Sequence, residues 1–303
     1  MNKYEKKLNK FFPQQINVEI KDNKIILEGE LNSWAEVVQA GKICATKYSK
    51  IHVVNHIKVK GLEFPKMRIP NIQNNELENS QPDVLIIGGG INGCAILREL
   101  SRYQLNLLLI EKESDVALAA SGRNDGEIHP GVDLGKGSLK QKYVVQGNRM
   151  YDQISKELDV PFKRVGQYVA VDKKYKPLLK ILAWQRKYIC KVDDTKVLSG
   201  EEVHKLEPAL KYENRVFLAN PMAGSVCPYG LTIAYAENAI TNGAKISLNT
   251  AALSIETNDH KIISVTTNKG TIYPKYVINC AGVYSDEIAK MANDEFFTIH
   301  PRS

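Results

Sequence analysis

The chain has 303 residues, of which 43% are hydrophobic and 25% charged, and its formal net charge is +7. This length is sufficient for two domains with cores of their own. The N-terminal lysines are not interleaved with aromatic residues, so we expect solvated surface charge and no nucleic-acid partner.

Targeting segments and metal motifs are not apparent. No apolar stretch follows the first lysines as it would in a signal peptide, and no window has the apolar length of a membrane span. The cysteines stand far apart without a C-x-x-C pair, which argues against a zinc site or an iron–sulfur cluster. We therefore expect reduced thiols and a cytoplasmic location. The five cysteines are Cys44, Cys94, Cys190, Cys227 and Cys280.

The first sixty residues have the pattern of a small α+β module. Two apolar segments, 16–20 and 25–27, predict a pair of β-strands that turns at Asp22 and Asn23.

A helix and a third strand complete this module. Ser33 and Glu36 have the spacing of a capping box, which predicts a helix that runs to about Lys47. Apolar residues on one face between positions 53 and 59 predict the third strand. The β-β-α-β order over residues 1–60 resembles a BON domain, a module linked with membrane or polymer attachment. The resemblance implies a docking appendage, with peripheral membrane contact as an alternative.

Residues 61–82 have the composition of a linker. They contain three prolines and several asparagines and show no periodicity. We place a domain boundary there and expect the main domain to occupy residues 83–303.

A glycine motif opens the main domain. The apolar run 84–87 predicts a buried parallel strand, and Gly88, Gly90 and Gly93 follow it as G-x-G-x-x-G. Such glycines permit a tight turn, close approach of the backbone to a pyrophosphate, and close packing of helix on strand. The pyrophosphate would lie at the N-terminus of the next helix, where N–H groups and the helix dipole favour an anion.

The continuation of this motif makes it more specific. A helical pattern follows the glycines, and a second apolar run, 107–110, ends in Glu111. A carboxylate at this distance can accept hydrogen bonds from both hydroxyls of a ribose, and it would repel the 2′-phosphate of NADP. The pattern predicts a dinucleotide site that excludes NADP.

The middle of the chain alternates polar loops with helices. Residues 119–131 are polar and rich in glycine, so we expect them to bring backbone N–H groups against a ligand. Helices are predicted over residues 147–158 and 176–190, and after a cap at Ser199. We interpret residues 217–230 as a loop-rich approach to the next helix.

The last third predicts one more helix and then strands. The helix covers residues 231–241, and Asn242 and Gly243 form its C-cap. The final apolar strand, 276–279, runs into a turn of small residues. Such a strand would return to the same nucleotide. The other expected strands cover residues 245–248, 252–256, 262–267 and 271–273.

Three segments together resemble one family. The glycine motif with Glu111, the segment SGRNDGEIHPG (121–131) and the segment VINCAGVYSD (277–286) are similar to FAD-dependent glycerol-3-phosphate dehydrogenases and oxidases. That family belongs to the D-amino-acid oxidase-like group. The resemblance implies an α/β fold with a Rossmann-like FAD-binding domain and part of an α+β substrate domain. The nucleotide-binding part would cover residues 83–160 and 225–290, and the partial substrate domain residues 161–224 and 291–303.

The resemblance also implies the site. His129 stands where the family has a histidine beside the flavin, and it would be the base that takes the hydroxyl proton while a hydride leaves for the flavin. The residues assigned to FAD are Gly88, Gly90, Ile91, Asn92, Gly93, Glu111, Lys112, Ser121, Arg123, Asn124, Gly126, Ala281 and Gly282.

Three functions remain open at this point. The first is oxidation of sn-glycerol 3-phosphate to dihydroxyacetone phosphate, with quinone, oxygen or a protein as electron acceptor. The second is oxidation of a 2-hydroxy acid such as 2-hydroxyglutarate, so that the partner is a phosphorylated or a carboxylated alcohol. Because family members continue beyond the equivalent of residue 303, we expect a truncated chain, and the third function is a non-catalytic flavin-binding or scaffold protein.

Overall fold

The computed structural model describes residues 2–45, 51–63 and 66–300. The chain divides into two compact units, the first containing Met1–Ala120 and Ala239–Ser303 and the second Ser121–Asn238. The second unit begins at residue 121, within the range 83–160 that we expected to bind the nucleotide. The loop after this residue belongs to the second unit because its backbone pairs with strands of that unit.

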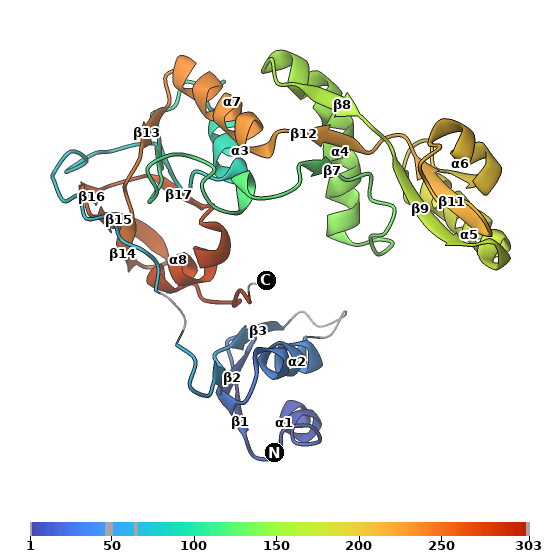
Figure 1. The fold of residues 1–303 in the computed structure, drawn as a ribbon. Coiled ribbons are helices and arrows are strands. Elements are labelled where there is room, and N and C mark those ends of the chain that lie inside the picture. Colours follow the sequence, from blue (N-terminus) through green and yellow to red (C-terminus); the bar gives the residue numbers. More distant parts are fainter. Residues whose placement is uncertain (1, 46–50, 64–65, 301–303) are drawn as a thin grey trace. The chain divides into compact units, whose positions relative to one another are not determined.

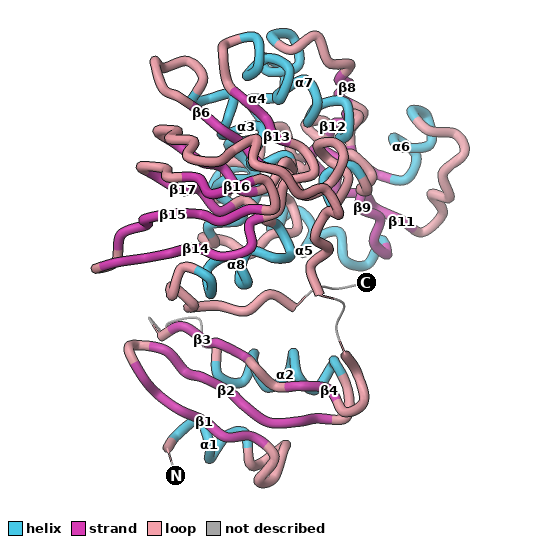
Figure 2. The backbone as a smooth tube through the Cα atoms, turned by 90° about the vertical axis from the view of Figure 1, so that its left-hand side faces the viewer, coloured by secondary structure: helices cyan, strands magenta, loops and turns pink. Residues whose placement is uncertain are grey.

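The N-terminal module is a four-stranded sheet with two helices. Strand β1 pairs antiparallel with β2, and β2 pairs in parallel with β3 and β4. Figure 2 shows the long strands of this sheet with α2 beside them. Leucine, isoleucine and valine side chains of strands and helices share one core. The elements are α1 (Lys3–Leu8), β1 (Ile16–Lys21), β2 (Lys24–Leu31), α2 (Trp34–Cys44), β3 (His52–Asn55) and β4 (Lys58–Val59).

Local signals in this module are confirmed. Asp22 and Asn23 have φ values of 46° and 61°, the left-handed conformation that both central residues of a type I′ turn require. Ser33 accepts a hydrogen bond from the Glu36 amide and Glu36 bonds back, which forms the predicted capping box. Helix α1 was not predicted, and the expected end of α2 at Lys47 lies outside the described residues.

The expected linker, residues 61–82, is attached to the first unit over its second half. The Leu77 amide donates to the Lys269 carbonyl at 2.8 Å, and the Asn79 amide donates to the Thr271 carbonyl at 2.9 Å. The Leu77 side chain is buried in the core of that unit. The polar composition of this segment predicted a linker. Its backbone N–H groups nevertheless form hydrogen bonds with the first unit, because backbone pairing does not depend on the type of side chain.

A parallel sheet lies at the centre of the first unit. Its strand order is β13-β6-β5-β17, and all three pairings are parallel; Figure 1 labels the two outer strands, β13 and β17. Residues on one face of β5 and β6 pack against the antiparallel sheet β14-β15-β16 and helix α8. The elements are β5 (Val84–Ile87), α3 (Ile91–Leu100), β6 (Leu107–Ile110), β13 (Lys245–Ser247), β14 (Ala252–Asn258), β15 (Lys261–Thr267), β16 (Gly270–Ile272), β17 (Tyr276–Asn279) and α8 (Ser285–Met291).

The second unit contains two antiparallel sheets of three strands, in the orders β10-β11-β9 and β7-β12-β8. Helix α7 leads from this unit back into the first. The elements are β7 (Glu127–Ile128), α4 (Leu139–Glu157), β8 (Phe162–Arg164), β9 (Gln167–Asp172), α5 (Lys176–Trp184), a π-helical turn η3 (Gln185–Ile189), β10 (Lys196–Ser199), α6 (Gly200–Leu206), β11 (Arg215–Asn220), β12 (Gly224–Val226) and α7 (Pro228–Thr241).

Two sequence interpretations in this unit are wrong. Helix α4 begins at Leu139 after a Ser138 cap, eight residues before the expected start, so Gly147 lies inside the helix. The segment 217–230, interpreted as a loop-rich approach to the next helix, contains the end of β11 and all of β12. Strand β11 is buried on both faces between β9 and β10, so its apolar run shows no alternation.

Candidate functional site

The turn between β5 and α3 admits no side chain at two of its glycines. Gly88 has φ = 113°, and a Cβ atom there would lie 2.3 Å from the Cys280 carbonyl oxygen. A Cβ atom on Gly93 would lie 2.0 Å from the Gly88 carbonyl oxygen. Three backbone segments thus meet without intervening side chains, as the glycine motif predicted.

Helix α3 presents its N-terminus at this turn. Gly90 is the N-cap residue, its backbone is extended, and it makes no side-chain capping hydrogen bond. The helix has ten residues, and Ile91 and Asn92 belong to its first turn, which contains no acidic residue. The dipole of a helix of this length favours an anion at its N-terminus. The turn therefore fits a dinucleotide pyrophosphate.

The Glu111 carboxylate lies directly against the glycine turn. Its Oε2 accepts a hydrogen bond from the Gly89 amide at 2.6 Å, and its Oε1 accepts one from the Glu113 amide at 2.9 Å. These bonds fix the carboxylate at the end of β6, beside the turn. The position suits a ribose next to a pyrophosphate.

The other residues of the first unit that were assigned to the cofactor are Lys112, Ala281 and Gly282, and they lie near this turn. Ala281 lies next to Gly88, since a Cβ atom on Gly88 would be 3.1 Å from its Cα. Gly282 has φ = 60° and begins a 3₁₀ turn. The Lys112 ammonium lies 5.2 Å from the centre of the Tyr284 ring and pairs with Glu113. This pairing, together with Arg68, holds the pKa of Glu113 below its ordinary value.

Burial disfavours the thiolate forms of the two thiols near the turn, so they are poor nucleophiles. Burial raises the pKa of Cys94 to about 12, and its Sγ lies 3.5 Å from the Gly89 carbonyl oxygen. Burial also raises the pKa of Cys280. Both residues act as small apolar fillers beside the backbone crossing.

The other candidates lie in the second unit, on the loop before β7 and directly after this strand. Asn124 donates to the Ser121 carbonyl at 2.9 Å and accepts from the Gly126 amide at 2.9 Å, which fixes the loop. A Cβ atom on Gly126 would lie 2.1 Å from the Val226 carbonyl oxygen. The Arg123 side chain is exposed at this loop.

Both ring nitrogens of His129 are engaged. Nδ1 accepts a hydrogen bond from the Gly131 amide at 2.8 Å, and Nε2 lies 3.1 Å from Oδ1 of Asp133. Because Nδ1 accepts, we assign the proton to Nε2, where it faces the carboxylate. Asp133 therefore orients the imidazole.

Sequence reasoning missed the residues that hold His129 in place. The buried Asn148 amide donates to the carbonyls of Ile128, His129 and Met222 at 3.3, 3.2 and 3.0 Å. Arg164 donates to the Asn148 side chain at 2.9 Å. In the sequence, Asn148 could have been recognised as a polar residue at a core-facing position of a helix. That position can be identified only when the start of α4 is known.

An ion pair between Arg164 and Asp152 adds to the hydrogen bonds around Asn148. Arg164 donates to Oδ2 of Asp152 at 2.6 Å, and this bond holds the pKa of the Asp152 carboxyl below its ordinary value. Asp152 is four residues after Asn148 on α4, so a single helix face presents both partners of Arg164.

Replacing Asn148 with leucine should destabilise the second unit. Leucine has a similar volume but removes the amide donor of the Ile128 and His129 carbonyls and one acceptor of the Arg164 guanidinium. Arg164 keeps its bonds to Asp152 and to the Met222 carbonyl, so the loss in the free energy of unfolding should be about 2 kcal/mol. Chemical denaturation followed by circular dichroism measures it. Gln153→Leu, on the exposed face of the same helix, is the control and should change stability by less than about 0.5 kcal/mol. Equal effects of the two variants would contradict the anchoring role.

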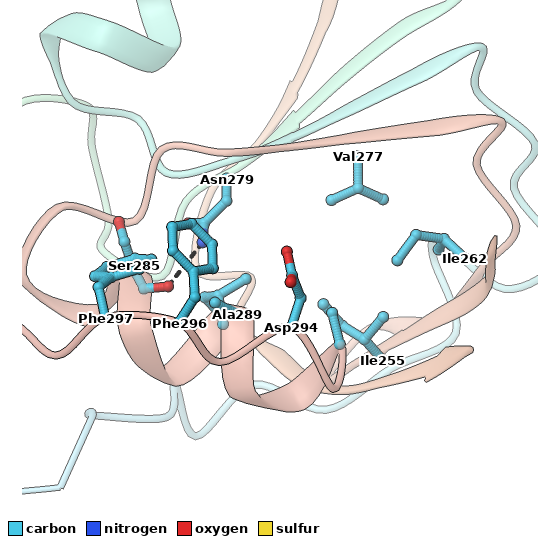
Figure 3. A pocket seen from close by; sticks show the side chains of 11 residues that line it. Ile255, Ile262, Val277, Asn279, Ser285, Ala289, Asp294, Phe296 and Phe297 are labelled. Carbon is cyan, nitrogen blue, oxygen red and sulfur yellow. Dashed lines mark hydrogen bonds between the residues drawn. The ribbon is translucent and has the colours of Figure 1, made fainter. Parts of the chain in front are cut away.

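A separate pocket of about 370 Å³ lies in the first unit between β14, β15, β17 and α8. Figure 3 shows its apolar walls, including Ile255, Val277 and Phe296, with the carboxylate of Asp294 among them. Asn279 also lines the pocket, and its side-chain amide donates a 2.8 Å hydrogen bond to the Ser285 carbonyl. None of the residues assigned to the cofactor or to catalysis lines it.

Metal-binding clusters and membrane-spanning helices are absent from the described part of the chain. Among residues 2–45, 51–63 and 66–300, no cluster of three histidine, cysteine or acidic side chains has the arrangement of a metal site. Within the same ranges, every helix is too short or too polar to cross a bilayer.

Comparison with known proteins adds independent information. Residues 83–303 match the family model described as FAD dependent oxidoreductase. A glycerol 3-phosphate dehydrogenase from Caloramator mitchellensis is 42% identical over 224 residues, which is 73% of this chain and 46% of that protein. A mitochondrial L-2-hydroxyglutarate dehydrogenase from Nematostella vectensis is 32% identical over 237 residues, covering 73% of this chain and 51% of that protein.

The solved structures show the same likeness. An L-alpha-glycerophosphate oxidase from Mycoplasma pneumoniae, reduced with dithionite and with FAD bound, aligns with a TM-score of 0.64 at 30% identity. The alignment covers 71% of this chain and 57% of that one. The chain therefore spans about half the length of the relatives that it matches.

Proposed function

Because this chain belongs to the FAD dependent oxidoreductase family, matched over residues 83–303, we propose that it forms the flavin-binding part of an enzyme that oxidises sn-glycerol 3-phosphate. The product would be dihydroxyacetone phosphate. The observation that carries this proposal is the 42% identity to a glycerol 3-phosphate dehydrogenase over most of the matched region.

The residues of the first unit would hold the adenine nucleotide end of the cofactor. Gly88, Gly90 and Gly93 would accept the pyrophosphate against the backbone, with Ile91 and Asn92 supplying the first turn of α3. Glu111 would accept the ribose hydroxyls in place of its present amide donors. Lys112, Ala281 and Gly282 would line the approach to this end of the cofactor.

The loop of the second unit would hold the reacting end. Ser121, Arg123, Asn124 and Gly126 would lie along the pyrophosphate and flavin, and His129 would act as the base. Bound FAD supplies a two-electron acceptor, which no side chain offers. His129 would take the hydroxyl proton at Nδ1, which requires the Gly131 amide to give way to the substrate, while Asp133 holds the proton on Nε2.

Anaerobic flavin bleaching tests this proposal. The purified chain should retain or take up FAD and lose its visible absorbance with sn-glycerol 3-phosphate, with dihydroxyacetone phosphate formed in equal amount. Glycerol, which lacks the phosphate, is the control. Readmitting oxygen or adding a quinone then identifies the electron acceptor. Failure to bind FAD would refute the cofactor assignment, and flavin that no substrate bleaches would point to the non-catalytic alternative.

A second candidate function is oxidation of a 2-hydroxy acid. The L-2-hydroxyglutarate dehydrogenase relatives are 27–32% identical, against 42% for the glycerol 3-phosphate dehydrogenase, but they match 69–73% of this chain. Bleaching by L-2-hydroxyglutarate in preference to sn-glycerol 3-phosphate would establish this function instead.

For the N-terminal module we propose a BON-like docking role. Its parallel pairing of β3 with β2 across helix α2 supports this proposal, as does its separate core. Deleting residues 1–60 should leave flavin binding intact while removing any docking function. Loss of flavin from the deleted chain would contradict a pure docking role.

A further inference from the structure

Helix α5 and the turn η3 carry an unusual concentration of positive charge. Residues 173–192 contain seven lysines and arginines and no acidic residue. The net charge of this segment is therefore +7, which is also the formal net charge of the entire chain. The segment lies at one end of the second unit, beside β9 and β11 (Figure 1).

One face of α5 is packed and the opposite face is exposed, yet both are apolar. Leu179 and Ala183 are buried in a core shared with Val216 and Leu218. On the exposed face, Leu178, Ile181, Trp184 and Tyr188 have relative exposures of 64%, 65%, 57% and 56%. We call the exposed set the α5 stripe. It consists of Tyr175, Leu178, Ile181, Trp184, Tyr188 and Ile189.

Lysines border this stripe. The Lys174 ammonium lies 5.1 Å from the centre of the Tyr175 ring, and that of Lys187 lies 5.7 Å from the Tyr188 ring. Lys180, which lies between these two lysines in the sequence, is also exposed. Long lysine stems can lie along an apolar surface while the ammonium reaches a polar one.

Not every cation of the segment belongs to this border. The Arg186 guanidinium donates to the Leu134 carbonyl at 2.9 Å. Hydrogen bonds at the start of α6 are the main cause of the lowered pKa values of Glu201 and Glu202. The charge of Lys176 lowers both values further, and that of Lys173 lowers the value of Glu201. The border therefore consists of Lys174, Lys180, Lys187 and the exposed Lys191.

Single exposed apolar residues are ordinary, but six on one short stretch mark an interaction surface. Tryptophan and tyrosine with lysines at their edges are the residues enriched where a helix lies in the plane of a lipid interface. Because the border is basic and lacks acidic partners from its own segment, its charge complements an anionic surface. We propose that the α5 stripe binds the surface of an anionic lipid bilayer, with α5 parallel to the membrane plane.

The two tryptophans of the chain make this proposal testable. Trp184 lies in the α5 stripe, and Trp34 lies in the N-terminal module. In a Trp34→Phe variant, the emission of Trp184 should shift to shorter wavelength when vesicles of phosphatidylcholine with roughly a third phosphatidylglycerol are added. In a Trp184→Phe variant, Trp34 should not respond. A response of Trp34 without one of Trp184 would overturn the proposal in favour of membrane contact through the N-terminal module.

Vesicle co-sedimentation separates the charge from the apolar contribution. Lys180→Glu with Lys187→Glu should lower the bound fraction about tenfold, as should Leu178→Ser with Ile181→Ser. Leu139→Ser, an equally exposed leucine on α4, is the matched control and should bind like the unchanged chain. Circular dichroism confirms that each variant remains folded.

Two other results would overturn the proposal. Equal binding to pure phosphatidylcholine would show that the lysines do not select an anionic surface. A concentration-dependent dimer in gel filtration that Leu178→Ser with Ile181→Ser abolishes, without vesicle binding by the unchanged chain, would identify a second copy as the occupant of the stripe.

Discussion

Replacing Gly93 with alanine should lower the affinity of the chain for FAD by on the order of a hundredfold. The new Cβ would lie 2.0 Å from the Gly88 carbonyl oxygen, which is backbone and cannot rotate away. The start of α3 must therefore move from the turn, and with it the N–H groups proposed to face the pyrophosphate. Titration with FAD, followed by quenching of flavin fluorescence, measures the affinity directly.

A matched substitution separates this local effect from general damage. Gly147→Ala introduces the same methyl group inside α4. Apart from the adjacent backbone of the helix itself, no atom lies within 4 Å of the new Cβ. Helix propensity makes that change neutral or stabilising. Flavin affinity of Gly93→Ala within about twofold of the Gly147→Ala value would exclude the glycine turn as the pyrophosphate site.

Replacing His129 with asparagine should slow the anaerobic bleaching of bound flavin by substrate about 10²- to 10⁴-fold, the usual contribution of a general base. Asparagine retains an acceptor for the Gly131 amide but cannot take a proton near neutral pH. Flavin content and the visible spectrum should stay the same, because His129 is not proposed to hold the cofactor. Stopped-flow absorbance after mixing with sn-glycerol 3-phosphate gives the rate.

His260 provides the control for this substitution. It lies exposed in the turn between β14 and β15 with φ = 59°, a conformation that asparagine tolerates well. His260→Asn should bleach at the original rate. If His129→Asn also bleaches at that rate, another group takes the proton and the assignment of His129 is refuted.

Local patterns predicted the parts of the structure that depend on neighbouring residues. The glycine turn, the apolar strands on either side of α3, and the caps at Ser33 and Ser199 are all present. Each rests on steric exclusion or on a hydrogen bond within a few residues, so a short window of sequence contains the necessary information.

Features that depend on tertiary packing could not be predicted in this way. The contact of Asn148 with the His129 carbonyl requires the pairing of β7, β8 and β12. His204 illustrates the same limit. It stacks on Tyr212 with 4.2 Å between ring centres. The partner lies beyond the end of α6, and helix periodicity does not reveal it.

The pairing of β5 with β17 also constrains how the protein folds. Val84 pairs with Tyr276, and the Gly88 turn rests on the Cys280 carbonyl, so strands from opposite ends of the matched region form one wall. During synthesis, β5 emerges early and keeps an open edge until β17 follows. The phosphate-binding turn therefore belongs to the slowly formed, high-contact-order part of the fold, and its apolar strands are exposed to aggregation in the interval.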